Sequence, residues 1–154
     1  MEEYKTKESI MQIVPHSGKM SLLDRVIDYD FEKLEIHTEV DIVPGSMFFD
    51  KDLGGIPVWI GFEYMAQSIS ALSGLYGKTK GQEPKIGFIM SVNNFTANKP
   101  LFPEYSIAKI FVKQTMRMDN VVTFDGNISL DGNIVATAVI NTIEMDDPKA
   151  VLEN

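Results

Sequence analysis

The sequence predicts an α+β protein, in which one antiparallel sheet packs against one nearly buried helix. A single stretch, residues 62–76, carries apolar and small residues at helical spacing over its whole length. Two stretches before this helix and four after it have the composition of strands. Most of the linkers between these strands are short, and short linkers join strands into hairpins, so we expect mostly antiparallel pairing.

Two predicted strands precede the helix. The second alternates apolar with charged residues, which is typical of a strand with one face on a core. In this alternation His37 shares a face with Glu35 and Glu39, so we expect its imidazole to face solvent. Before the first strand, residues 5–11 are expected to form a short helical turn and residues 15–20 a loop. The two strands are expected at residues 22–30 and 33–43, and a second loop at residues 44–55.

The predicted helix is flanked by Gly61 and Gly77, which mark its ends. Its faces carry small residues in place of the lysine and glutamate of a solvent-exposed helix, at Ser68, Ser70, Ala71 and Gly74. We therefore expect neighbouring elements to cover most of its circumference.

Four strands follow the helix, and residues 98–104, rich in proline, separate the first from the second. The expected strands are residues 86–95, 106–116, 121–130 and 134–144. Asp131-Gly132 suits a two-residue hairpin, because both positions of such a turn need positive φ. Residues 146–154 are expected to form a tail, and with no second-domain boundary residues 1–154 are expected to form one domain.

The composition excludes several classes of function. A net charge of -8 argues against a nucleic-acid partner. No run approaches the roughly 18 apolar residues of a membrane span and the N-terminus is too polar for a signal peptide, so we expect a cytoplasmic protein with no membrane partner. The absence of cysteine excludes disulfides and thiol catalysis. With no dinucleotide, phosphate-loop or metalloprotease motif, neither cofactor nor metal is expected.

Three stretches carry a family resemblance: Val14-Pro15-His16 with Leu22-Leu23-Asp24-Arg25-Val26, Pro57-Val58 with Glu63-Tyr64-Met65-Ala66-Gln67, and Ala97-Asn98-Lys99-Pro100-Leu101-Phe102-Pro103-Glu104. In this order they resemble the Leu-Pro-His opening, the Glu-Ala-Met-Ala-Gln helix and the Arg-Arg-Pro-Val-x-Pro-Gly turn of the hot-dog 3-hydroxyacyl thioester dehydratases of fatty-acid synthesis. The resemblance spans about residues 10–144. It implies a hot-dog fold, with the sheet wrapped around one long central helix.

One departure from that family concerns its catalytic histidine, which lies in a His-Phe-Pro-Gly stretch before the helix. Residues 49–55 read Phe-Asp-Lys-Asp-Leu-Gly-Gly here and contain no histidine. The tryptophan at Trp59 and the Pro-His-x-x-x-Met opening resemble a divergent branch found with aryl-polyene pigment synthesis. In that branch the histidine available for catalysis is the one at His16.

Dehydration of a 3-hydroxyacyl thioester needs a base for the C2 proton, an acid for the departing C3 hydroxyl and donors for the thioester carbonyl. Glu63, in the first helical turn, and His16 are the expected catalytic residues. Burial among Phe48, Phe49, Trp59 and Phe62 would raise the pKa of Glu63 and let it act as the acid. The expected substrate-binding residues are Gly61 with its neighbouring backbone N–H groups, Trp59, Phe62 and Gln67.

Each of these residues also has a purely structural interpretation. A glutamate in a first turn stabilises its helix, a histidine in a proline-flanked loop hydrogen-bonds locally, and Gln67 would fill space beside the sheet. The partners implied by the resemblance are an acyl thioester on acyl carrier protein or coenzyme A and a second hot-dog subunit, identical or different. An acidic carrier would need a local basic patch, for which Lys78, Lys80, Lys85 and Lys99 are candidates. Thioester hydrolysis and a non-catalytic acyl-binding subunit remain as alternatives.

Overall fold

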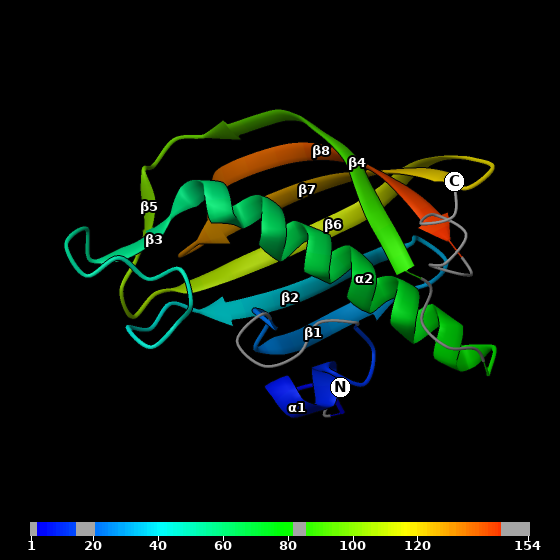
Figure 1. The fold of residues 1–154 in the computed structure, drawn as a ribbon, viewed down its shortest axis with the longest axis horizontal. Helices are drawn as coiled ribbons and strands as arrows, with labels where there is room; N and C mark the ends of the chain where they lie inside the picture. The colour runs from blue at the N-terminus through cyan, green and yellow to red at the C-terminus, as the bar shows by residue number, and fades with distance from the viewer. Residues whose placement is uncertain (1–2, 15–20, 82–85, 146–154) are drawn as a thin grey trace, which may run out of the picture.

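A six-stranded antiparallel sheet curves around one long helix, α2 (Figure 1). The structure is a computed structural model that describes residues 3–14, 21–81 and 86–145, and at residues 86–90 and 145 only the path of the backbone. The helical elements are α1 (Lys7–Ile10), a 3-10 turn (Val58–Ile60) and α2 (Gly61–Thr79). The strands are β1 (Arg25–Asp30), β2 (Glu35–Asp41), β3 (Gly55–Pro57), β4 (Ile86–Ala97), β5 (Leu101–Pro103), β6 (Ile107–Met118), β7 (Val121–Leu130) and β8 (Asn133–Met145).

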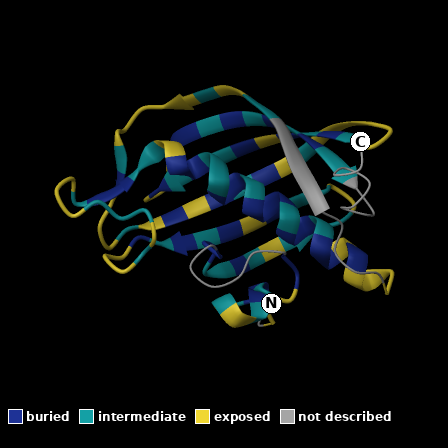
Figure 2. Cartoon of the chain, in the orientation of Figure 1, coloured by how far each residue is buried: buried dark blue, intermediate teal, exposed yellow. Residues whose placement is uncertain are grey.

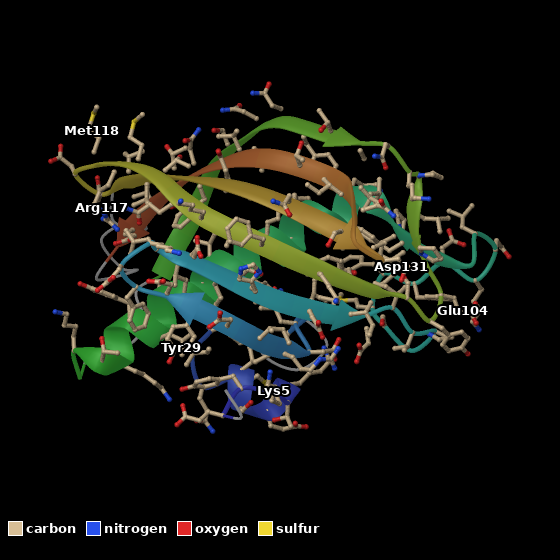
Figure 3. All side chains as sticks on the ribbon, turned by 180° about the vertical axis from the view of Figure 1, so that it is seen from behind. Lys5, Tyr29, Glu104, Arg117, Met118 and Asp131 are labelled. Carbon is tan, nitrogen blue, oxygen red and sulfur yellow. The ribbon has the colours of Figure 1, made fainter. Side chains whose placement is uncertain are left out.

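The large sheet has the strand order β1-β2-β6-β7-β8-β4. β6, β7 and β8 form a meander whose two turns lie at opposite ends of the sheet, with Arg117 and Met118 at one end and Asp131 at the other (Figure 3). At the second turn Asp131 and Gly132 have φ of 50° and 82°, as the hairpin prediction requires. Arg117 on β6 reaches across β7 to Glu144 on β8, with N···O of 2.8 Å. The predicted α+β class and the order of its main elements are confirmed.

The helix α2 is covered on most sides, as its composition predicts. Eleven of its 19 residues are buried, and Figure 2 shows them along the length of the helix. Two glycines permit the close approach: a Cβ on Gly74 would lie 1.8 Å from the carbonyl oxygen of Ile13, and one on Gly126 of β7 would lie 2.8 Å from the sulfur of Met65. The helix is longer than residues 62–76, because it begins at Gly61 and ends at Thr79.

Alternation along the strands separates the core from the outer face. On β2 Ile36, Thr38 and Val40 are buried, whereas His37 is exposed. The imidazole of His37 lies against Phe111 with ring centroids 4.5 Å apart. The predicted exposure of His37 is therefore confirmed.

The sequence prediction missed a second, two-stranded sheet, in which β3 pairs with β5. Both strands have three residues and contain proline, so composition alone favours a loop. What holds them together is the pair Ile56 and Phe102, which lie opposite each other and are 1% and 0% exposed. This small sheet carries the chain directly into the 3-10 turn and α2.

The N-terminal segment packs against the helix and the start of β1. Lys7 of α1 donates to the carbonyl oxygens of Ser21 and Leu22 at 3.0 and 3.2 Å, and its ammonium lies 3.3 Å from the carboxylate of Asp24. Within the described residues no helix is both long enough and apolar enough to cross a membrane.

Candidate active site

Glu63 lies in the first turn of α2 and is half-buried in the single chain. Its carboxylate forms no hydrogen bond or ion pair with any group in the described part of the chain. The helix dipole stabilises a carboxylate at this position. Within the described residues, both carboxylate oxygens of Glu63 are therefore available to bind a substrate or a proton.

Gly61, the first residue of α2, packs closely against side chains of β7 and β5. A Cβ there would lie 2.8 Å from Cδ1 of Ile128 on β7 and 3.3 Å from Cζ of Phe102 on β5. The N–H of Gly61 is directed to the carbonyl oxygens of Val58 and Trp59 in the preceding 3-10 turn. Donation from the N–H of Gly61 to a thioester oxygen remains a prediction. The same N–H would then have to donate to the thioester oxygen and to a carbonyl of the 3-10 turn.

The aromatic residues of this turn do not enclose Glu63 within one chain. Trp59 is 58% exposed, and Phe62, three residues later, is half-buried. Phe48 and Phe49 are partly buried and pack against the core from the preceding loop. A dry site around Glu63 therefore needs a further covering surface over Trp59 and Phe62.

Gln67 lies one helical turn after Glu63 and is 1% exposed. Its side-chain oxygen accepts a hydrogen bond of 2.8 Å from the backbone N–H of Leu22. Through this bond the central helix holds the segment that follows the stretch carrying His16. His16 itself lies outside the described residues, and the substrate-binding role of Gln67 remains a prediction.

The loop where the resembled family has its histidine is closed on itself. A carboxylate oxygen of Asp50 accepts from the N–H groups of Asp52 and Leu53 at 2.9 and 3.1 Å, and the N–H of Asp50 donates to the carbonyl of Gly55 at 2.8 Å. Gly54, with φ of 74°, completes the turn. The carboxylate of Asp50 thus stabilises the turn of the backbone, and the loop contains no histidine that could act in catalysis.

The predicted basic patch is not one patch. Lys78 and Lys80 are exposed at the C-terminal end of α2, whereas the carbonyl of Pro100, next to Lys99, accepts from Val58 beside its N-terminal end. A helix of 19 residues is about 28 Å long, so Lys99 belongs to the opposite end of the helix from the other two. Lys85 lies outside the described residues.

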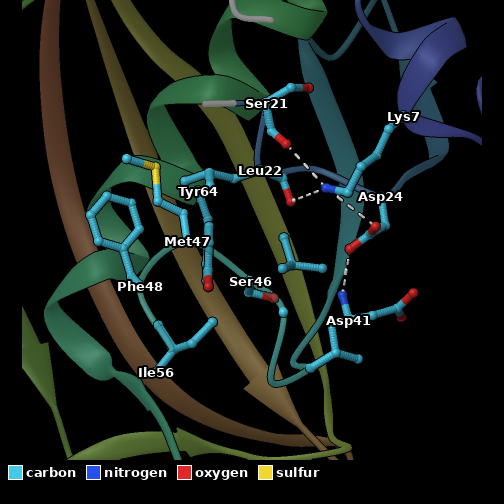
Figure 4. A pocket seen from close by; sticks show the side chains of 13 residues that line it. Lys7, Ser21, Leu22, Asp24, Asp41, Ser46, Met47, Phe48, Ile56 and Tyr64 are labelled. Atoms are coloured by element: carbon cyan, nitrogen blue, oxygen red, sulfur yellow. Dashed lines mark hydrogen bonds and ion pairs between the residues drawn. The ribbon is translucent and has the colours of Figure 1, made fainter. Parts of the chain in front are cut away.

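Sequence reasoning passed over Tyr64, the neighbour of Glu63. Its side chain is 1% exposed and lines a pocket of about 250 Å³ together with residues of β2 and of the loop before β3 (Figure 4). One signal was present, since the helix of the resembled family has alanine at this position. Burial of a tyrosine with its hydroxyl directed into a cavity does not follow from spacing alone.

The antiparallel sheet curved around one long helix is the arrangement of a hot-dog protein. The model of the ApeP-like family, described as ApeP dehydratase, matches residues 8–153, and the chain belongs to this family. The resemblance seen in the sequence, to a divergent branch of the hot-dog dehydratases, is therefore confirmed.

The chain is also similar, at low sequence identity, to curated dehydratases. The 3-hydroxyacyl-[acyl-carrier-protein] dehydratase FabZ of Xanthomonas campestris pv. campestris (strain B100) is 27% identical over 135 residues, which cover 85% of this chain and 86% of the relative. FabZ of Rhizobium etli is 25% identical over 137 residues, which cover 87% and 85%.

Solved structures share the fold. A chain of the dehydratase heterocomplex ApeI:P from Xenorhabdus doucetiae superposes with a TM-score of 0.84 at 24% identity, covering 94% of this chain and 95% of that one. A hypothetical thioesterase with coenzyme A from Streptococcus pneumoniae gives a TM-score of 0.62 at 11% identity, covering 79% and 84%. These similarities establish the hot-dog fold.

Proposed function

We propose that the protein is a 3-hydroxyacyl thioester dehydratase, which removes water from a 3-hydroxyacyl group on a carrier and leaves the 2-enoyl thioester. The observation that supports this most directly is Glu63, a half-buried carboxylate without a described partner in the first turn of the central helix. It belongs to a chain of a dehydratase family.

The reaction needs only proton transfers. A base removes a proton from C2, the C2=C3 double bond forms as the C3–O bond breaks, and an acid protonates the departing hydroxyl to give water. In this proposal Glu63 and His16 share the two roles. Backbone N–H groups at the start of α2 stabilise the charge that develops on the thioester carbonyl.

The carrier is proposed to be an acyl carrier protein, by analogy with the names of the FabZ relatives, and the reaction is expected to take place in the cytoplasm. Coenzyme A thioesters are the natural comparison substrate. The protein's net charge of -8 opposes an acidic carrier overall, so docking would depend on local lysines. Lys99 is a candidate, because the residue after it contacts Val58 beside the start of α2.

The test is the absorbance of the conjugated enoyl thioester formed from a 3-hydroxyacyl substrate. Glu63→Gln keeps the size of the side chain and removes the titratable group, so we expect kcat/KM to fall by at least about a hundredfold. Glu104→Gln is the matched control, because Glu104 is an exposed glutamate remote in sequence from the helix. Equal activity of the wild type and Glu63→Gln would refute the role of Glu63.

A second candidate is a hot-dog subunit that acts only together with a different subunit. The closed loop at Asp50, which carries no histidine, favours this alternative, and the heterocomplex of the similar ApeI:P structure supports it. Inactivity of the purified chain, with activity restored by a second hot-dog subunit, would identify it. Thiol release from an acyl thioester that lacks the 3-hydroxyl would instead indicate a hydrolase.

A further inference from the structure

A pocket of about 250 Å³ lies beside the first turn of α2, between that turn, the end of β2, the loop at residues 43–48 and the segment at residues 21–24 (Figure 4). Its walls are mainly apolar and include Leu22, Val40 and Ile56. Val43 and Met47, 40% and 44% exposed, lie on its solvent side. Since an apolar cavity of about 150 Å³ holds a benzene molecule, this pocket has room for a ring and a few further atoms.

The hydroxyl of Tyr64 points into this pocket (Figure 4). The side chain is 1% exposed, and its ring packs on that of Phe102 with centroids 5.7 Å apart. Its hydroxyl forms no hydrogen bond with any group that the structure describes. Burial, and then the charge of Asp24, raise the pKa of Tyr64, so the hydroxyl keeps its proton and is a donor. The hydroxyl is a donor that faces the pocket, and an acceptor on a bound ligand would take the place of solvent there. Oγ of Ser21, which also lines the pocket, is buried without a hydrogen-bond partner among the described residues.

The charged side chains around the pocket are already paired. Lys7 donates to the backbone carbonyls of residues 21–23 and lies 3.3 Å from the carboxylate of Asp24. The other carboxylate oxygen of Asp24 accepts from the N–H of Asp41 at 2.7 Å, and Asp41 is paired with Arg25. A charged ligand would have to break these contacts or lose its hydration without a counter-charge. The pocket therefore suits a neutral ligand.

We propose that this pocket binds a neutral, ring-sized group with one hydrogen-bond acceptor, such as an aromatic ketone, and that the Tyr64 hydroxyl donates to this acceptor. Glu63, Trp59 and Phe62 do not line the pocket, whereas Phe48, one of the aromatic residues expected around Glu63, does. The proposal does not depend on the dehydratase activity and can be tested without a substrate.

Fluorine NMR of three small probes tests it on the full chain in its own assembly. The probes are 4-fluoroacetophenone, which is neutral with an acceptor, 4-fluorotoluene, which lacks the acceptor, and 4-fluorobenzoate, which is charged. In the wild type we expect the ketone to bind about five- to tenfold more tightly than the toluene, the usual effect of one neutral hydrogen bond. In Tyr64→Phe the ketone should fall to the affinity of the toluene, and the toluene should not change.

A second variant separates loss of the site from loss of the fold. Met47→Ala alters an exposed side chain of the pocket and leaves Tyr64 in place, so it should weaken the ketone and the toluene by the same factor. Equal binding of ketone and toluene in the wild type would overturn the proposal. Binding of the benzoate as tight as that of the ketone, an unchanged ketone affinity in Tyr64→Phe, or no binding of either neutral probe would do so as well.

Discussion

The hydroxyl of Thr38, on β2, lies 2.7 Å from that of Ser68, on α2, and both side chains are buried. Ser68 donates its only hydroxyl proton to the carbonyl of Tyr64 at 2.8 Å, so Thr38 is the donor between the two hydroxyls. This short chain of hydrogen bonds joins the sheet to the helix one turn after Glu63. It fixes the position of the helix along the sheet in a way that apolar contacts alone do not.

The first prediction concerns this pair. Thr38→Val removes one buried hydrogen bond and should lower the free energy of unfolding by about 1 kcal/mol, whereas Ser68→Ala leaves the Thr38 donor buried without an acceptor and should cost about 1–3 kcal/mol. The double variant should lose clearly less than the sum of the two. Denaturant unfolding of all four proteins measures this coupling, and additive costs would show that the two hydroxyls do not interact.

The second prediction concerns Gly74, where the helix touches the N-terminal segment. In Gly74→Ala the new Cβ would lie 1.8 Å from the carbonyl oxygen of Ile13, so the segment must move away. Although alanine favours a helix by up to about 1 kcal/mol over glycine, we expect a net loss of roughly 1–3 kcal/mol and a Tm lower by several degrees. Gly45→Ala is the control, because nothing lies within 4 Å of its added Cβ. An unchanged Tm of Gly74→Ala would contradict the close contact.

Periodicity predicted the parts of the fold in which burial repeats regularly. β7 was found at residues 121–130 because Val122, Phe124, Ile128 and Leu130 alternate with less buried residues, and the same regularity in α2 identified the helix. β3 and β5 were missed because a three-residue strand contains too few residues to show alternation. Their pairing depends on Ile56 meeting Phe102 from 46 residues away in the sequence, which no local pattern records.

The candidate site was predictable only in part. The carboxylate of Glu63 follows from the start of the helix, since the first turn is where a carboxylate meets free N–H groups. The contact of Gln67 with Leu22, and the direction of the Tyr64 hydroxyl, depend on which segments cross the helix. These contacts depend on tertiary structure, because the periodicity of a helix in the sequence is the same whichever segment packs against it.

The third prediction concerns pH. Arg25 donates to both carboxylate oxygens of Asp41 and to Glu39, and the hydrogen bond from Arg25 is the main reason why the pKa of Asp41 lies below its usual range. A depressed carboxyl pKa adds stability that is present above the unfolded-state pKa of about 3.9 and is lost as the pH falls through the lower, folded-state value.

Arg25→Met should therefore lower the free energy of unfolding at pH 7, and this difference from the wild type should shrink as the pH falls from about 5 towards 2. Both side chains are partly exposed, so we expect the effect to be modest and to weaken with salt. Denaturant unfolding across this pH range measures it. Lys33→Met, which removes an exposed positive charge, is the control and should show a much smaller change. A difference that stays constant with pH would argue against the Arg25–Asp41 pair.

The last prediction concerns the two histidines of the chain. His37 is exposed on the outer face of the sheet, with its imidazole against Phe111, so His37→Ala should leave turnover almost unchanged. If dehydration uses a histidine, only His16 is then left for it. We expect His16→Ala to lower kcat/KM by at least about a hundredfold, the usual scale for one general acid or base.

The measurement is enoyl formation from a 3-hydroxyacyl thioester. The unfolding midpoints of both variants are compared with that of the wild type to show that each variant is folded. Full turnover by His16→Ala would remove the histidine from the mechanism and leave Glu63 to act alone or with a residue of a partner subunit. Loss of activity in His16→Ala that a second hot-dog subunit restores would instead support the heteromeric alternative.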